Sequence, residues 1–308
     1  MPVYAYVVNR RGLFSRPGTS RHETLAGVPR SCPNSTCHRT KDSGNNTVKT
    51  YKTLRVERSG PACIITLNRP ERRNAISIEL MDELIDAMAS VDNDAEVRGV
   101  IITGGDEYFA AGADLNEALE IKTAEQGVDY FRRWHRVCDA LETSKKPVIA
   151  AIEGFCMTGG CELVLACDLR VGARGSTYAI TSARIGTVAG AGGTQRLPRI
   201  VGQAYALEIL FAAEPFTAED AYRMGLINRL TDKGGALAEA KKLVDLYATR
   251  APLSLALVKR AVHRGMQMDL ASGLEFETFL VTTIYGTEDK QEGISAFLEK
   301  RKADFKGR

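Results

Sequence analysis

Three glycine-rich segments contain the residues whose types and spacing are best suited to chemistry. They span residues 109–114 (Phe-Ala-Ala-Gly-Ala-Asp), 158–162 (Thr-Gly-Gly-Cys-Glu) and 189–196 (Ala-Gly-Ala-Gly-Gly-Thr-Gln-Arg). The first two lie between an expected strand and an expected helix, where backbone N–H groups lack partners and can receive negative charge. None of the three matches a phosphate-binding loop or a dinucleotide fingerprint. Taken singly, each segment is better explained as a tight turn.

Glu162 is the acidic residue best placed for proton transfer. It follows Gly159 by three residues, so both lie on one face of the expected helix, one turn apart. A carboxylate in that position can reach a water molecule or a substrate proton. The alternative is an acidic residue that only stabilises the first turn of a helix, an effect of at most about 1 kcal/mol.

The remaining polar residues are weaker candidates. His135 is expected to be structural and His263 to face solvent. Asp168 and Arg170 are expected to stabilise the strand next to them rather than to take part in catalysis. The sequence has no cluster of metal ligands, so we predict that there is no metal site.

The order of the expected strands and helices predicts an α/β fold. Short apolar runs typical of strands occur at residues 54–57, 63–67, 100–102, 147–152 and 169–171. Between them, apolar residues at helical spacing occur at residues 78–91, 128–141 and 159–167. Strands that alternate with helices in this way favour a mainly parallel sheet.

The C-terminal part is predicted to be almost wholly helical after Gly193. Helical segments are expected at residues 202–213, 217–224, 234–250, 252–266 and 270–303. The last of these has more apolar residues than a surface helix needs. This excess favours a subunit interface, and a contact within the chain is the alternative.

Composition restricts the class of protein. The chain has 308 residues, of which 44% are hydrophobic and 26% are charged, as in ordinary globular proteins. The formal net charge of +3 is too small to favour binding to nucleic acid or to an anionic membrane. No apolar run approaches the roughly 20 residues of a membrane-spanning helix. The odd number of cysteines, 7, favours free thiols in a reducing compartment.

Residues 1–48 differ from the rest of the chain. They are rich in arginine, poor in acidic residues, and without sustained hydrophobic periodicity. Such a segment cannot bury enough apolar surface to offset its ordering entropy, so we predict a disordered leader or a transit-like extension. The predicted location is the cytoplasm, with the mitochondrial matrix as the alternative.

Five motifs, taken together, resemble the crotonase (enoyl-CoA hydratase/isomerase) superfamily. They are Asn68-Arg69-Pro70 with Asn74-Ala75, and residues 109–114, 159–162, 190–197 and 299–302, in the order and spacing of that family. The resemblance covers the chain from about residue 51 to its end. It implies a spiral of ββα units, which we place at residues 49–245. A helical C-terminal trimerisation region follows at residues 246–308, so the resemblance implies a homotrimer or a hexamer.

The resemblance also implies where the substrate binds. The N–H groups of Ala113 and Gly159 would form an oxyanion hole for the oxygen of an acyl-CoA thioester. The residues expected to line the substrate and its coenzyme A are Ala110, Ala111, Gly112, Ala113, Asp114, Leu115, Gly159 and Gly160. Arg72 or Arg73, together with Lys300 of the partner subunit, would approach the phosphates of coenzyme A.

Glu162 matches one of the two catalytic glutamates of the family, and the second is missing here. That second glutamate lies twenty positions later in a Pro-Glu pair, which in this chain reads Thr181-Ser182. In the family two carboxylates divide the acid and base steps of hydration. The hydroxyl of Ser182 is too weak an acid to donate a proton near neutral pH. Ser182 is therefore expected to hold a water molecule or to orient a carbonyl.

The first functional hypothesis is an enoyl-CoA hydratase-like lyase in which Glu162 is the acid or base. The alternatives are a one-carboxylate variant, which would be an isomerase, decarboxylase or thioester hydrolase, and a non-catalytic acyl-CoA-binding or RNA-binding member. The expected partner is a small acyl-CoA, and no nucleic acid or membrane. No cofactor is expected, because coenzyme A is part of the substrate.

Overall fold

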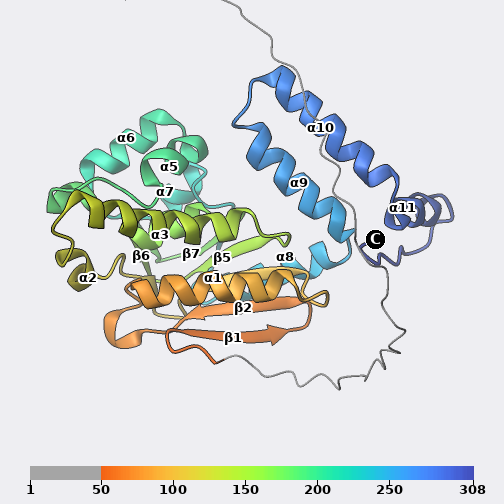
Figure 1. The fold of residues 1–308 in the computed structure, drawn as a ribbon. Coiled ribbons are helices and arrows are strands. Elements are labelled where there is room, and N and C mark those ends of the chain that lie inside the picture. Colours follow the sequence, from red (N-terminus) through yellow and green to blue (C-terminus); the bar gives the residue numbers. More distant parts are fainter. Residues whose placement is uncertain (1–49) are drawn as a thin grey trace, which may run out of the picture. The chain divides into compact units, whose positions relative to one another are not determined.

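A six-stranded sheet forms the centre of the computed structural model, which describes residues 50–308 (Figure 1). Its strand order is β1-β2-β3-β5-β7-β10. β1 and β2 form an antiparallel hairpin around Gly60, which has a φ of +57°, and the other neighbouring strands run parallel. The strands are β1 (Leu54–Ser59), β2 (Ala62–Leu67), β3 (Gly99–Thr103), β5 (Val148–Ile152), β7 (Leu169–Ala173) and β10 (Arg229–Thr231). The predicted mainly parallel sheet is confirmed.

A second sheet of four short strands lies beside the first and repeats a ββα pattern. β3, β5 and β7 are each followed by a strand of this second sheet and then by a helix. Its strand order is β4-β6-β8-β9, and its members are β4 (Tyr108–Ala110), β6 (Phe155–Met157), β8 (Thr177–Ala179) and β9 (Phe216–Thr217). Each sharp passage from a short strand to its helix therefore occurs at the same edge of the fold.

Helices cover both faces of the main sheet (Figure 1). The helices up to the end of the ββα region are α1 (Ile78–Asp92), α2 (Leu115–Leu119), α3 (Ala124–Glu142), α4 (Gly159–Leu165), α5 (Gly193–Val201), α6 (Gln203–Ala212), α7 (Ala218–Arg223) and α8 (Ala236–Ala248), with short 3-10 helices η1 (Pro70–Arg72) and η2 (Ser182–Ile185). Polar side chains cap the N-termini of several of these helices. Ser77 accepts a hydrogen bond from the N–H of Leu80 at the start of α1, and Thr123 and Gln126 form a capping box at the start of α3.

Alternate residues of the central strands point to two separate cores. Val100 and Ile102 of β3 pack with α1 and α3, whereas Ile101 packs with Val244 of α8 on the other face. Strands buried on both faces read as continuous apolar runs, which is why they were recognisable in the sequence.

The C-terminal region consists of three helices that lie beside the ββα units (Figure 1). They are α9 (Pro252–Gly265), α10 (Leu270–Tyr285) and α11 (Glu288–Leu298). The prediction of one helical segment over residues 270–303 is wrong at Gly286, where α10 ends, and Thr287 caps the new helix by accepting from the N–H of Lys290. The predicted boundary at residue 245 falls within α8 and stays a prediction. The predicted leader at residues 1–48 lies outside the described residues.

A buried ion pair attaches α9 to the main sheet. The ammonium of Lys259, whose side chain is 8% exposed, lies 2.8 Å from the Asp168 carboxylate, and it also donates to two backbone carbonyls. His263 lies 3.0 Å from the same carboxylate, so the expectation that it only faces solvent is wrong. Arg170 donates instead to carbonyls of Val164, Cys167 and Leu226, so it stabilises β7 without pairing with Asp168.

Replacing Lys259 with Met is expected to lower the free energy of unfolding by roughly 3 kcal/mol, because a carboxylate that is only 18% exposed then loses its lysine cation. Urea unfolding followed by circular dichroism measures this change. Lys242→Met is the matched control, since Lys242 makes an exposed ion pair with Glu239 and should change stability by no more than about 1 kcal/mol. Equal effects of the two substitutions would contradict the anchoring role of Lys259.

Candidate active site

The segment before α1 holds residues 109–114 in place. The side-chain amide of Asn74 donates to the carbonyls of Gly104 and Phe109 at 3.0 and 3.1 Å, and its oxygen accepts from the N–H of Arg69 at 3.0 Å. The guanidinium of Arg69 lies 3.0 Å from the carboxylate of Asp114. The motif at residues 68–75 therefore holds the motif at residues 109–114 in position.

The N–H of Ala113 is left free by the way this segment pairs with Ile76. Ile76 donates to the carbonyl of Gly112 at 2.7 Å and accepts from the N–H of Asp114 at 3.0 Å. In such a parallel bridge the N–H of the intervening residue points to the opposite side. The N–H of Ala113 accordingly has no acceptor among residues 50–308.

The N–H of Gly159 is also without an acceptor, because Gly159 is the first residue of α4. A β-carbon at position 159 would lie 3.1 Å from the nitrogen of Ala113 and 2.8 Å from Cη2 of Trp134. Only glycine allows the two backbone segments to approach so closely. The nitrogen of Ala113 therefore lies close to Gly159, and that the two N–H groups form an oxyanion hole stays a prediction.

Thr158 sets the direction in which Gly159 enters α4. Thr158 has a φ of +43°, which is unusual for a residue with a β-carbon. Its hydroxyl lies 2.8 Å from the hydroxyl of Thr181 and accepts from the N–H of Thr181 at 3.3 Å. A proline at position 181 could supply neither contact, so Thr181 contributes to the geometry of this turn.

The third glycine-rich segment holds the carboxylate of Glu162. Oε1 of Glu162 accepts from the N–H of Ala191 at 2.8 Å and from the N–H of Gly193 at 2.9 Å. A β-carbon at position 193 would lie 2.9 Å from Oε1, so a glycine is required there. Gly193 begins α5, whose N-terminus favours negative charge. The sequence singled out this segment but not its role as the support of Glu162.

Burial raises the pKa of Glu162 to about 7, although the N–H groups of Gly193 and Ala191 act in the opposite direction. The residue is 3% exposed. Oε2 makes no hydrogen bond within residues 50–308, which leaves it available to a substrate or a water molecule. A carboxyl group with a pKa near neutrality can both accept and release a proton.

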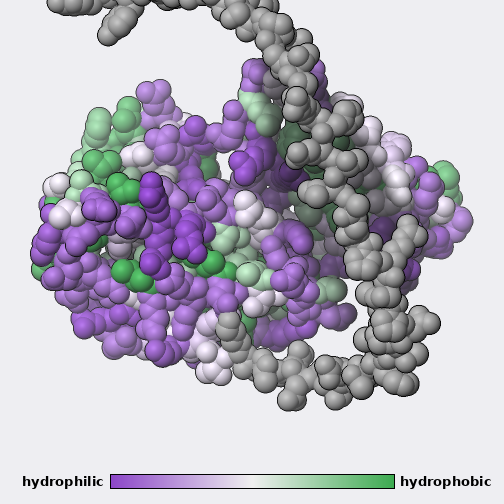
Figure 2. Space-filling view, viewed as in Figure 1, coloured by the Kyte–Doolittle hydropathy of each residue, from purple (hydrophilic) through white to green (hydrophobic). Residues whose placement is uncertain are grey.

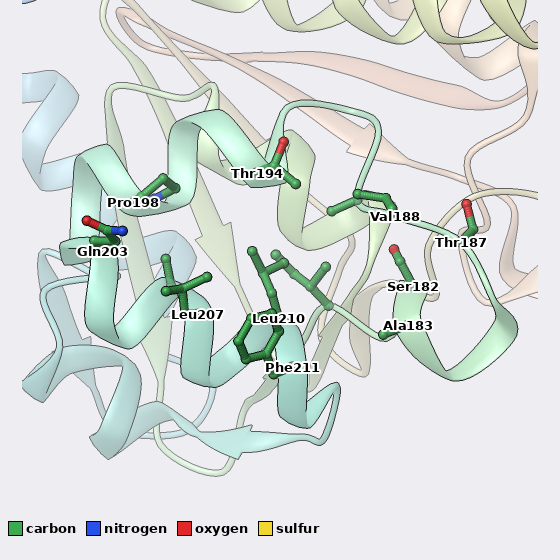
Figure 3. A pocket seen from close by; sticks show the side chains of 13 residues that line it. Ser182, Ala183, Thr187, Val188, Thr194, Pro198, Gln203, Leu207, Leu210 and Phe211 are labelled. Atoms are coloured by element: carbon green, nitrogen blue, oxygen red, sulfur yellow. The ribbon is translucent and has the colours of Figure 1, made fainter. Parts of the chain in front are cut away.

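Ser182 lies at the start of η2 and borders a cavity of about 550 Å³ (Figure 3). On the opposite side the cavity is lined by Leu207, Leu210 and Phe211 of α6. The hydroxyl of Ser182 makes no hydrogen bond within the part of the chain that the structure describes. None of the residues that line this cavity is acidic, so no carboxylate from another element replaces the missing glutamate there.

The other predicted contacts of the substrate differ in exposure. Ala111 and Leu115 are exposed, whereas Ala110 is fully buried. A β-carbon on Gly160 would lie 2.7 Å from the β-carbon of Ala110, so these two residues pack against each other. Their contact with the substrate, like that of Gly112 and Asp114, stays a prediction.

The three predicted phosphate contacts lie on two different elements of the chain, at the end of η1 and after α11. Arg72 and Arg73 are exposed at the end of η1, where the carbonyl of Arg73 also accepts from the N–H of Ala111 at 3.0 Å. Lys300 follows α11, which lies beyond α9 and α10 from the two sheets (Figure 1). The contact of Lys300 of a partner subunit with the coenzyme A phosphates stays a prediction.

Between residues 50 and 308, no three His, Cys, Asp or Glu side chains are grouped so as to hold a metal ion. None of the helices in the same range has the length and apolar character needed to span a bilayer.

Comparison with known proteins gives a consistent result. The enoyl-CoA hydratase/isomerase family profile matches residues 57–308. The short-chain-enoyl-CoA hydratase of Clostridium acetobutylicum is 36% identical over 255 residues, which cover 82% of this chain and 97% of that protein. The mitochondrial enoyl-CoA hydratase of Pongo abelii is 37% identical over 79% of this chain and 83% of that protein.

A solved structure supports the same assignment. The crystal structure of enoyl-CoA hydratase from Bacillus anthracis superimposes with a TM-score of 0.79 at 33% identity, over 83% of this chain and all of that one. The ββα spiral is thus the crotonase fold that the five motifs predicted. The chain belongs to the enoyl-CoA hydratase/isomerase family of enzymes, within the crotonase superfamily.

Proposed function

We propose that this enzyme adds water to the C2=C3 double bond of an α,β-unsaturated acyl-CoA thioester. The observation that carries the proposal is the carboxylate of Glu162. It is buried, held by two N–H groups through one oxygen only, and placed one helical turn from the free N–H of Gly159. The hydratase names of the relatives favour water addition over the other reactions of the family.

The N–H groups of Ala113 and Gly159 bind the thioester oxygen in this mechanism. They draw electron density from the double bond, so that C3 becomes open to attack by water. Glu162 takes a proton from that water through Oε2. The enolate that forms carries its negative charge on the thioester oxygen, where fixed N–H dipoles stabilise it more than they stabilise the substrate. The proposed mechanism uses no cofactor, because coenzyme A is part of the substrate.

A panel of acyl-CoA thioesters, analysed by mass spectrometry, tests the reaction. Hydration adds one water to the substrate, whereas isomerisation leaves its mass unchanged and moves the double bond. Decarboxylation releases CO2, and thioester hydrolysis releases free coenzyme A. Calorimetry on the same sample measures binding, so a chain that binds acyl-CoA without any turnover would exclude the enzymatic proposal.

We further propose that the chain assembles as a homotrimer or a hexamer. α10 buries only Leu280 within one copy, and it exposes Leu274, Phe279 and Tyr285. Figure 2 shows a mainly hydrophilic surface on which hydrophobic residues are visible over α6 and α11. Assembly would also bring Lys300 of the partner subunit toward the coenzyme A phosphates near Arg72 or Arg73.

Replacing Phe279 with Asp is expected to convert the assembly into single chains, because a charge would replace a side chain that is 68% exposed in one copy. Light scattering of the purified variant measures its mass. Thr278→Asp is the control, since the same charge then lies about 100° away around the helix. A wild-type protein with the mass of one chain would contradict the proposed assembly.

We propose the cytoplasm as the location, with the mitochondrial matrix as the alternative. The relatives include a bacterial protein and one named mitochondrial, which supports either compartment. Fusing residues 1–48 to a fluorescent reporter distinguishes them, because only a transit sequence would carry the reporter into mitochondria.

A further inference from the structure

The cavity that Ser182 borders is larger than the shortest unsaturated acyl groups need. Its volume of about 550 Å³ lies in the range of cavities that enclose whole small-molecule ligands. A methylene group takes about the volume of one water molecule in a liquid, roughly 30 Å³. A four-carbon acyl group would therefore fill only a small part of the cavity, and a longer chain could enter it.

One wall of the cavity lies next to the carboxylate of Glu162. A β-carbon on Gly193 would lie 2.9 Å from the β-carbon of Ala189 and also 2.9 Å from Oε1 of Glu162. Ala189 is one of the residues that line the cavity. The cavity wall and the carboxylate are thus separated by little more than the backbone of Gly193.

The same cavity is bordered by the segment that contacts the turn before α4. Ser182 lines the cavity and directly follows Thr181, whose hydroxyl lies 2.8 Å from the hydroxyl of Thr158. Thr158 in turn precedes Gly159, which carries one of the two N–H groups of the predicted oxyanion hole. The cavity therefore lies beside both groups that the proposed hydration uses.

The side chains around the cavity carry no charge. Its apolar wall comes from α6, where Leu207, Leu210 and Phe211 face Ser182 and Val188 (Figure 3). None of the described residues that line it is acidic or basic. A carboxylate or ammonium group placed there would lose its water without gaining a partner of opposite charge. An uncharged apolar chain would instead gain from leaving water.

The serine at position 182 is part of this character. The resemblance to the crotonase superfamily implies a glutamate at that position, which would bring a negative charge to the edge of the cavity. The shorter, uncharged side chain of Ser182 leaves this edge neutral and open. The replacement that removes a carboxylate thus also favours an apolar ligand in the cavity.

We propose that this cavity holds the acyl chain beyond C3, and that the preferred substrates are 2-enoyl-CoA thioesters with uncharged apolar chains of about eight carbons. Leu207, Leu210 and Phe211 then determine the specificity for the chain. The inference rests on the proposed hydration and names the substrate class of that site. Each methylene that leaves water for an apolar cavity strengthens binding roughly fourfold.

Hydration of three thioesters by the wild type tests the substrate class. The value of kcat/KM for 2-octenoyl-CoA should exceed that for crotonyl-CoA by at least about tenfold, since four more methylenes are buried. An eight-carbon 2-enoyl-CoA that ends in a carboxylate should fall at least about 100-fold below 2-octenoyl-CoA. Equal values for the three substrates, or a preference for the carboxylate, would overturn the inference.

Leu207→Trp tests whether α6 determines this preference. Leu207 is 40% exposed, so the larger ring can extend into the cavity without displacing the core. The ratio of kcat/KM for 2-octenoyl-CoA to that for crotonyl-CoA should fall at least about tenfold. Ala212→Trp is the matched control, because Ala212 is exposed, does not line the cavity, and lies about 140° away around α6. It should keep the ratio within about twofold.

Two measurements separate this inference from other outcomes. Light scattering shows whether the cavity instead holds part of a second copy: an altered mass of Leu207→Trp with an unchanged substrate ratio would overturn the inference. Calorimetry with butyryl-CoA and octanoyl-CoA measures binding without turnover. If the wild type hydrates nothing yet binds octanoyl-CoA more tightly, and Leu207→Trp removes the difference, only the proposed hydration fails. If it hydrates crotonyl-CoA but binds both saturated thioesters equally, only the inference fails.

Discussion

Replacing Glu162 with Gln is expected to lower kcat for hydration by roughly 100- to 10,000-fold while the fold is retained. The amide oxygen of glutamine can accept the same two hydrogen bonds from Ala191 and Gly193 that Oε1 accepts now. The amide cannot take a proton from water, so only the chemical step is lost. Steady-state kinetics together with thermal unfolding measures both quantities.

Glu153→Gln is the matched control for this experiment. Glu153 is also a buried glutamate held by N–H groups, but it uses both oxygens, one for Gly234 and one for Ala236 at the start of α8. Glutamine there loses one acceptor, so stability should fall while kcat is kept. If Glu162→Gln kept kcat within tenfold of the wild type, Glu162 would not be the base.

The pKa of Glu162 also predicts how stability and activity depend on pH. A free glutamate has a pKa of 4.5, and burial raises that of Glu162 to about 7. The folded protein thus binds this proton more tightly than the unfolded chain. Its contribution to stability is fully present below pH 4.5 and is lost as pH rises through about 7.

At pH 8 the buried carboxylate destabilises the wild type by on the order of 3 kcal/mol relative to low pH. Glu162→Gln should remove this pH dependence. Activity should change in the opposite sense, because the base must be deprotonated. We expect kcat/KM, which reports the free enzyme, to rise with pH through about 7 in the wild type. A pH profile without a rise near 7 would contradict the assignment of Glu162 as the base.

Replacing Gly159 with Ala should lower kcat/KM by roughly 100- to 1000-fold, the usual effect of losing one oxyanion donor. The added β-carbon would lie 2.8 Å from the ring of Trp134 and 3.1 Å from the nitrogen of Ala113. The ring or the backbone must move, and the two N–H groups then no longer meet at one oxygen. Kinetics with an unsaturated acyl-CoA measures the loss.

Gly127→Ala is the control for the glycine substitution. Gly127 lies in the same helix as Trp134, and a β-carbon there would meet only a side-chain atom of Ile121 at 3.8 Å. Alanine should stabilise this helix by up to about 1 kcal/mol and leave kcat/KM unchanged. Full activity of Gly159→Ala would show that the N–H groups of Gly159 and Ala113 do not bind the thioester oxygen.

Several short elements could not be predicted from the sequence. β4, β6, β8 and β10 have three residues each, and β9 has two, so none is long enough to show a period of alternating residues. They become strands because neighbouring ββα units place a partner beside them. The break between α10 and α11 was likewise missed, since Gly286 and Thr287 interrupt an apolar pattern that otherwise continues.

The candidate site, like the fold, could be predicted from the sequence only in part. The sequence by itself determined the glycine-rich turns, the spacing of Gly159 and Glu162 along one helix, and the serine at position 182, because these are properties of neighbouring residues. Only the tertiary structure decided that the N–H groups of Ala191 and Gly193 hold Glu162, and that the N–H of Ala113 has no acceptor in the described residues. Burial and the lack of a partner depend on every segment that packs around an atom, and those segments come from distant parts of the chain.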